Sequence, residues 1–151
     1  MESLYYVMNW ACHRKCVHCY ETRFRPYVRG ALEDVVQESE RNFPRIIDNL
    51  PERMTYLDTA APLPGGGYQE KVGRIILAGG EVLVEPVRQR VLYPVLERLR
   101  AKYGKGGIKI IIQTTGDLVT EQIIQDLLAR DVWMISISGM DDFHVGLEGD
   151  K

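Results

Sequence analysis

Residues 74–81 read RIILAGGE, an apolar run that ends in two glycines and a glutamate. The apolar part is nearly continuous rather than alternating, as in parallel strands that are buried on both faces. Three further segments have the same character: LYYVM (4–8), IKIIIQ (108–113) and VWMISI (132–137). The sequence therefore predicts four short parallel strands.

Helical periodicity fills the segments between these runs. Residues 31–50 have the spacing of an amphipathic helix, which Pro44 is expected to kink or to restart as a second segment. A second helix is expected with Pro86 near its first turn, apolar residues from Val91 to Tyr103 and Gly104 at its end. A third is expected to begin at Thr120 as its N-cap. The buried face of this third helix is predicted to consist of Ile123, Ile124, Leu127 and Leu128.

The resulting order, β-α-β-α-β-α-β, is typical of an α/β protein with a parallel sheet and right-handed crossovers. It fits either a doubly wound sheet or part of a βα barrel. Residues 51–73 interrupt the order with a stretch rich in proline and glycine. We expect this insertion to be a disordered or surface loop rather than a loop that docks a partner.

Composition narrows the class of protein. The chain has 151 residues and a net charge of −2, with 45% hydrophobic and 26% charged residues, as in an ordinary globular domain. No feature indicates a nucleic-acid partner or a membrane, since no apolar run approaches the ~18 residues that span a bilayer. The first residues do not resemble a signal peptide, so we expect a cytoplasmic protein.

All three cysteines of the chain, Cys12, Cys16 and Cys19, lie in the segment CHRKCVHC (12–19). Three clustered thiols are a poor disulfide framework, and the spacing CxxxCxxC is typical of a metal site in a reducing compartment. Three thiolates can hold three corners of a cuboidal iron–sulfur cluster. Because there is no fourth cysteine, one iron would keep an open position for a substrate or cofactor.

Three other interpretations of the cysteines are open from the residues alone. Zinc could be bound by the three thiolates together with His13 or His18. Cys16 and Cys19 could form a thioredoxin-like redox pair. The three thiols could also have no chemical role.

The cysteine segment directly follows the first predicted strand. The other three strands lead into GGE (79–81), TTGD (114–117) and SGMDD (138–142). In a parallel βα sheet these loops all lie at the carboxyl edge, where ligands bind. We therefore expect the four loops to meet at one site.

CHRKCVHC after the first strand, with GGE after the second, resembles the radical S-adenosylmethionine enzyme superfamily. TTG (114–116) and ISISGMD (135–141) are similar to later segments of that family. The resemblance implies a [4Fe–4S] cluster whose unique iron is chelated by S-adenosylmethionine. Reductive cleavage of that cofactor then gives a 5′-deoxyadenosyl radical, which abstracts a hydrogen atom from the substrate.

The resemblance also assigns roles to individual residues. Cys12, Cys16 and Cys19 would be the cluster ligands, and Gly79, Gly80 and Glu81 would bind the methionine ammonium of the cofactor. His18 would lie beside the adenine, whereas Ser136 and Ser138 would face the ribose or the methionine. A side chain at Gly80 is therefore expected to weaken cofactor binding while leaving the iron content unchanged.

The family's barrel normally has six βα units, and four strands would form about two-thirds of such a partial (βα)6 TIM-like barrel. Residues 1–151 are therefore expected to be the N-terminal portion of the catalytic domain, incomplete at the C-terminus and inactive alone. The implied partners are a flavodoxin- or ferredoxin-like electron donor and a peptide or small-molecule substrate. The alternative is a zinc- or cluster-binding interaction module without S-adenosylmethionine chemistry.

Overall fold

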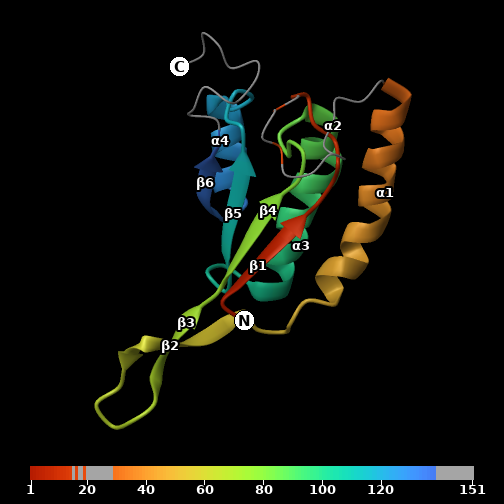
Figure 1. Ribbon diagram of the computed structural model, residues 1–151. Helices are drawn as coiled ribbons and strands as arrows, with labels where there is room; N and C mark the ends of the chain where they lie inside the picture. Colours follow the sequence, from red (N-terminus) through yellow and green to blue (C-terminus); the bar gives the residue numbers. More distant parts are fainter. Residues whose placement is uncertain (15, 17–18, 20–28, 139–151) are drawn as a thin grey trace.

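The computed structural model describes residues 1–14, 16, 19 and 29–138. Its main element is a four-stranded parallel sheet in the order β1-β4-β5-β6 (Figure 1). The strands are β1 (Ser3–Val7), β4 (Arg74–Ala78), β5 (Lys109–Thr114) and β6 (Val132–Ile137). All four predicted strands are present, and their ends differ from the prediction by one residue at most. The chain is thus an α/β protein, as predicted.

In the two central strands, β4 and β5, every second side chain faces the helices. Ile75 and Leu77 of β4 lie in the hydrophobic core with the apolar residues of the helices, and so do Ile110 and Ile112 of β5. Because consecutive βα units of the main sheet occupy neighbouring positions in it, the connecting helices pack against this same face (Figure 1).

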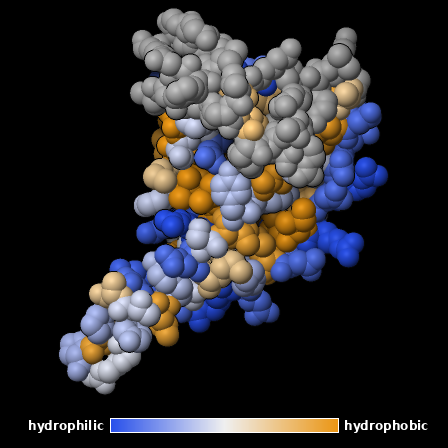
Figure 2. All heavy atoms as spheres, in the orientation of Figure 1, coloured by the Kyte–Doolittle hydropathy of each residue, from blue (hydrophilic) through white to orange (hydrophobic). Residues whose placement is uncertain are grey.

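The opposite face of the sheet is open in the part of the chain that the structure describes. Tyr5 is 49% exposed and Met134 is 42% exposed. The Tyr5 hydroxyl donates a hydrogen bond of 2.5 Å to Gln113 Oε1 across this face. Apolar side chains gather on the side of the molecule seen in Figure 2. The prediction of parallel strands is confirmed, but burial on both faces is not found for β1 and β6.

Helix α1 (Arg29–Asp48) runs without interruption through Pro44, so the predicted restart is wrong. Two arginines from later in the chain pair with α1 on both sides of the proline: Arg90 with Glu33 and Glu40, and Arg98 with Asp48. The lack of the backbone hydrogen bond that the proline cannot donate does not end the helix.

The second helical segment has three consecutive parts. These are α2 (Glu85–Val87), the π-helical turn η1 (Arg88–Leu92) and α3 (Tyr93–Tyr103). Gly104 ends α3 with φ 72°, as predicted for a glycine at a helix C-terminus. The π-helical turn was not predicted, because its side-chain pattern does not differ from that of an α-helix.

Helix α4 (Glu121–Leu128) begins where the sequence predicts, since the Thr120 hydroxyl accepts a hydrogen bond from the backbone N–H of Ile123. Its predicted buried face is half correct. Ile123 and Leu127 are buried, but Ile124 is 38% and Leu128 is 63% exposed, because the described residues cover only one side of the helix. No helix in the described ranges is long and apolar enough to cross a membrane.

The insertion at residues 51–73 forms an antiparallel hairpin of β2 (Thr55–Pro62) and β3 (Tyr68–Val72). The prediction of a disordered or irregular loop is therefore wrong, whereas its position at the surface is confirmed, since no residue of β2 or β3 is buried. Gly66 and Gly67 adopt positive φ values of 95° and 82° at the turn, which is how this glycine-rich stretch connects two strands. The hairpin extends away from the four-stranded sheet at the end opposite to its carboxyl edge (Figure 1).

Candidate functional site

The cysteine segment and the GGE turn meet at the carboxyl edge of the sheet, as predicted. Two backbone hydrogen bonds join them: Gly80 N–H donates to Asn9 O at 3.2 Å, and Glu81 N–H donates to Ala11 O at 2.7 Å. The parallel pairing of β1 with β4 continues in this way past the ends of both strands. The backbone that leads to Cys12 is therefore fixed against the GGE turn.

The two glycines of the GGE turn are required by this close approach. A Cβ atom at Gly80 would lie 1.9 Å from Ala11 O and 2.9 Å from Cys12 Cβ. A Cβ atom at Gly79 would lie 2.8 Å from Asn9 O. The chain itself thus explains why both positions lack a side chain, before any ligand is considered.

Asn9 supports the same junction from the side of β1. Its side chain is 2% exposed, and its Oδ1 accepts a hydrogen bond of 2.8 Å from the backbone N–H of Ala11. Its buried Nδ2 has no hydrogen-bond partner among the described residues. A buried donor of this kind favours a further polar partner at the junction.

The three cysteines form no disulfide in the structure and are half-buried. Burial raises the pKa of the Cys12 thiol, and the negative charges of Glu81, Cys16 and Cys19 raise it further, while a hydrogen bond from Arg14 N–H to Cys12 Sγ lowers it. Within the described ranges no three His, Cys, Asp or Glu side chains already form a ligand set. The fit to a cluster rests on the donor type, three neighbouring thiols that lose protons on binding metal.

Glu81 is 1% exposed, and both of its carboxylate oxygens accept hydrogen bonds from the chain. Oε1 accepts from Leu83 N–H at 2.9 Å and from the Thr114 hydroxyl at 2.7 Å. Oε2 accepts from Thr115 N–H at 2.8 Å, and the Thr115 hydroxyl oxygen lies 2.9 Å from it. In the structure the Glu81 side chain therefore joins the GGE turn to the TTGD loop. Its contact with a cofactor ammonium stays a prediction.

The TTGD loop also reaches the cysteine segment through Asp117. The Asp117 carboxylate accepts hydrogen bonds from His13 Nε2 at 2.7 Å, from Arg14 Nη2 and from the Thr115 hydroxyl. Burial alone would raise the pKa of this carboxyl, but the hydrogen bonds from His13, Thr115 and Arg14 outweigh it and lower the pKa to about 2. Three of the four predicted loops are thus joined at one edge by direct contacts.

The remaining predicted site residues are the two serines at the end of β6, His18 and the fourth loop. Ser136 is half-buried on β6 beside Gln113, and Ser138 follows the strand, where its backbone N–H donates to Thr114 O at 2.9 Å. Both serines therefore lie next to the end of β5. His18 and residues 139–142 of the fourth loop lie outside the described residues.

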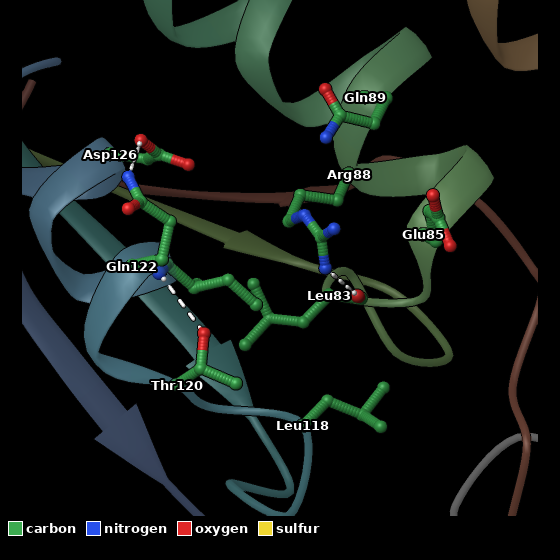
Figure 3. A pocket seen from close by; sticks show the side chains of 9 residues that line it. Leu83, Glu85, Arg88, Gln89, Leu118, Thr120, Gln122 and Asp126 are labelled. Carbon is green, nitrogen blue, oxygen red and sulfur yellow. Dashed lines mark hydrogen bonds between the residues drawn. The ribbon is translucent and has the colours of Figure 1, made fainter.

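A cavity of about 420 Å³ lies between η1 and α4, on the helical side of the sheet (Figure 3). Arg88 and Asp126 line it, and Arg88 Nη1 donates to Leu83 O at 3.1 Å. None of the predicted site residues contributes to its lining. This cavity is separate from the junction of the loops.

Sequence reasoning placed the TTGD loop at the site, but it gave no individual role to Thr114, Thr115 or Asp117 and did not identify Asn9. The available signal was the cluster of polar residues directly after a buried strand, which marked TTGD as a loop at the correct edge. Comparison of the chain with family models, with curated proteins and with solved structures found no match.

Proposed function

We propose that this chain is the cofactor-binding part of a radical S-adenosylmethionine enzyme. The observation that supports this proposal best is the junction between the cysteine segment and the GGE turn. Three thiols without a disulfide follow a strand end, and Ala11 and Cys12 at the start of their segment lie against Gly80. An electron-transfer cluster would take four cysteines, whereas three leave one metal position for a cofactor.

Cys12, Cys16 and Cys19 would hold a [4Fe–4S] cluster. When bound, such a cluster supplies the electron that cleaves S-adenosylmethionine for hydrogen abstraction from a substrate. Because the Glu81 carboxylate is occupied by the chain, we expect the cofactor ammonium to meet backbone carbonyls of the turn at Gly79 and Gly80.

His18, Ser136 and Ser138 would contact other parts of the cofactor. The enzyme would act in the cytoplasm with a flavodoxin- or ferredoxin-like electron donor, on a peptide or small-molecule substrate. No nucleic acid or membrane would take part.

The sheet would be about two-thirds of a partial (βα)6 TIM-like barrel. Strands that follow chain order, with all helices on one face, are consistent with such a barrel. A doubly wound sheet would reverse its strand order. The open face with Tyr5 and Met134 would then line the barrel interior, and further βα units would pair with the free edge of β6.

Anaerobic reconstitution of residues 1–151 with iron and sulfide tests the proposal. We expect a brown protein with broad absorbance near ~400 nm and equal amounts of iron and sulfide. The matched control carries Cys12→Ala, Cys16→Ala and Cys19→Ala and should stay colourless. A colourless wild-type protein with one tightly held zinc would contradict the proposal and favour the interaction module. A full cluster in the Cys16→Ala variant would contradict the assignment of the three ligands.

A further inference from the structure

Cys12 lies between two positions at which the backbone of the cysteine segment is fixed. On its N-terminal side, Ala11 O accepts a hydrogen bond from Glu81 N–H, and Ala11 N–H donates to Asn9 Oδ1. On its C-terminal side, His13 and Arg14 both donate to Oδ2 of Asp117. The first attachment comes from the GGE turn, and the second comes from the loop that follows β5.

The second attachment joins residues that are far apart in the sequence. His13 and Asp117 are 104 residues apart in the chain, yet His13 Nε2 lies 2.7 Å from Asp117 Oδ2. The Asp117 and Arg14 side chains are only 10% and 11% exposed. Hydrogen bonds to a charged group are stronger than neutral ones, and partial burial protects them from screening by salt.

Asp117 is itself held by a rigid part of the fold. Its Oδ1 accepts from the Thr115 hydroxyl, and the Thr115 backbone N–H donates to the buried Glu81. Gly116 turns the chain between them with φ 88°, and a Cβ there would lie 2.6 Å from Ile137 Cγ2. The carboxylate position is thus set by β5, by Glu81 and by β6.

We propose that Asp117 is a positioning residue for the metal site. By fixing His13 and Arg14, it holds the Cys12 thiol and the start of the cysteine segment in the geometry that binds metal. This inference rests on the proposed function, because it assigns to Asp117 a role toward the same three thiols. Neighbours that orient metal ligands typically change metal affinity 10–100-fold when they are removed.

The test compares wild-type protein, Asp117→Asn and Asp126→Asn. Asn keeps the size of the side chain but removes the charge that His13 and Arg14 contact. Asp126 is a suitable control, because its carboxylate also accepts hydrogen bonds, from Tyr93 OH and Gln122 Nε2, but it lies on α4 away from the cysteines. Each protein is reconstituted with iron and sulfide, and the release of iron to a chelator is followed anaerobically.

We expect release from Asp117→Asn to be about ten-fold faster or more, with a changed electron paramagnetic resonance spectrum of the reduced cluster. Asp126→Asn should match the wild type in both measurements. Hydrogen–deuterium exchange of the metal-free proteins provides a second readout. Exchange should increase in residues 9–14 of Asp117→Asn and stay unchanged in α3, which separates local loosening from general unfolding.

Equal iron release and an unchanged spectrum in Asp117→Asn, from a wild type that binds a cluster, would overturn this inference and leave the proposed function standing. Increased exchange throughout Asp117→Asn would also overturn it, since the residue would then be needed for folding in general. A wild-type protein that binds no iron would overturn both.

Discussion

Gly80 lies at the contact between two segments that are about seventy positions apart in the chain. Its missing side chain lets Ala11 O and Cys12 Cβ approach the GGE turn. The sequence led to the expectation that a side chain here would block the cofactor and spare the iron. In the structure, the side-chain atoms of a substituted residue 80 would instead clash with Ala11 and Cys12 of the chain itself.

We predict that Gly80→Ala lowers the free energy of unfolding by about 1–3 kcal/mol, as overpacking does, and also lowers the iron content after reconstitution. Urea unfolding and iron analysis check the two effects. Gly65→Ala is the control, since a Cβ at Gly65 has no heavy atom within 4 Å. Wild-type iron content in Gly80→Ala would mean that the cysteine segment can move away without losing its ligands.

The Asp117 carboxyl gives the stability a defined dependence on pH. Its pKa in the folded chain is about 2, compared with an ordinary value of 3.8. Because the folded pKa is the lower one, the stability that Asp117 contributes is present above the ordinary value and is lost as the pH falls toward 2. Asp117→Asn has no such carboxyl to protonate.

We therefore predict that the difference in unfolding free energy between wild type and Asp117→Asn narrows as the pH falls from about 5 to about 3. Urea unfolding of both proteins at several pH values measures the difference. A difference that stays constant across this range would show that the hydrogen bonds to His13 and Arg14 do not depend on the charge of the carboxylate.

Among the helices, α1 depends on a side chain of α3 to bind the backbone carbonyl groups at its C-terminus. The last carbonyl groups of a helix have no partner within it. Lys102 Nζ of α3 donates to three backbone carbonyls at this end, those of Ile47, Asp48 and Leu50, at 2.7–2.9 Å. Helix α1 is thus stabilised by a contact that its own sequence does not contain.

We predict that Lys102→Met, which keeps the aliphatic part of the side chain, lowers the free energy of unfolding by about 2 kcal/mol. Lys105→Met, in the exposed turn after α3, is the control and should have an effect within about 0.5 kcal/mol. Urea unfolding measures both variants. A loss in Lys102→Met no larger than in the control would indicate that water can replace the amine at these carbonyls.

In the whole molecule, exposed apolar residues gather at the edge formed by β6 and α4. Trp133 is 56%, Met134 is 42% and Ile137 is 51% exposed on β6, and Leu128 is 63% exposed on α4. β6 pairs only with β5 in the described part of the chain. An unpaired strand of this kind is a site for pairing with another chain.

We predict that residues 1–151 self-associate with increasing concentration and that Met134→Lys reduces this association, because a charge at an edge strand opposes pairing. Leu57→Lys, at a position of the hairpin that is 61% exposed, is the control and should leave the association unchanged. Sedimentation velocity over a range of concentrations measures the self-association of the wild type and of both variants. An equal reduction by Leu57→Lys would assign the association to the hairpin instead.

The sequence alone predicted the parts of the fold that depend on local pattern. Continuous apolar runs identified the strands, Thr120 marked the start of α4, and Gly104 marked the end of α3. The sequence also indicated which loops share the carboxyl edge, since that follows from the topology of parallel strands. It missed the hairpin at residues 55–72, because proline and glycine are common to loops and to the turns between strands.

Tertiary structure decided which polar groups of those loops meet. Glu81 could be assigned to a ligand from its motif, but only the fold shows that Thr114, Thr115 and Leu83 already occupy its carboxylate. The contact of Asp117 with His13 was equally invisible in sequence, since it joins residues 104 positions apart. Local pattern sets where a strand ends and which loop follows it. The packing of β1, β4 and β5 side by side sets the distances between those loops, and hydrogen bonding depends on these distances.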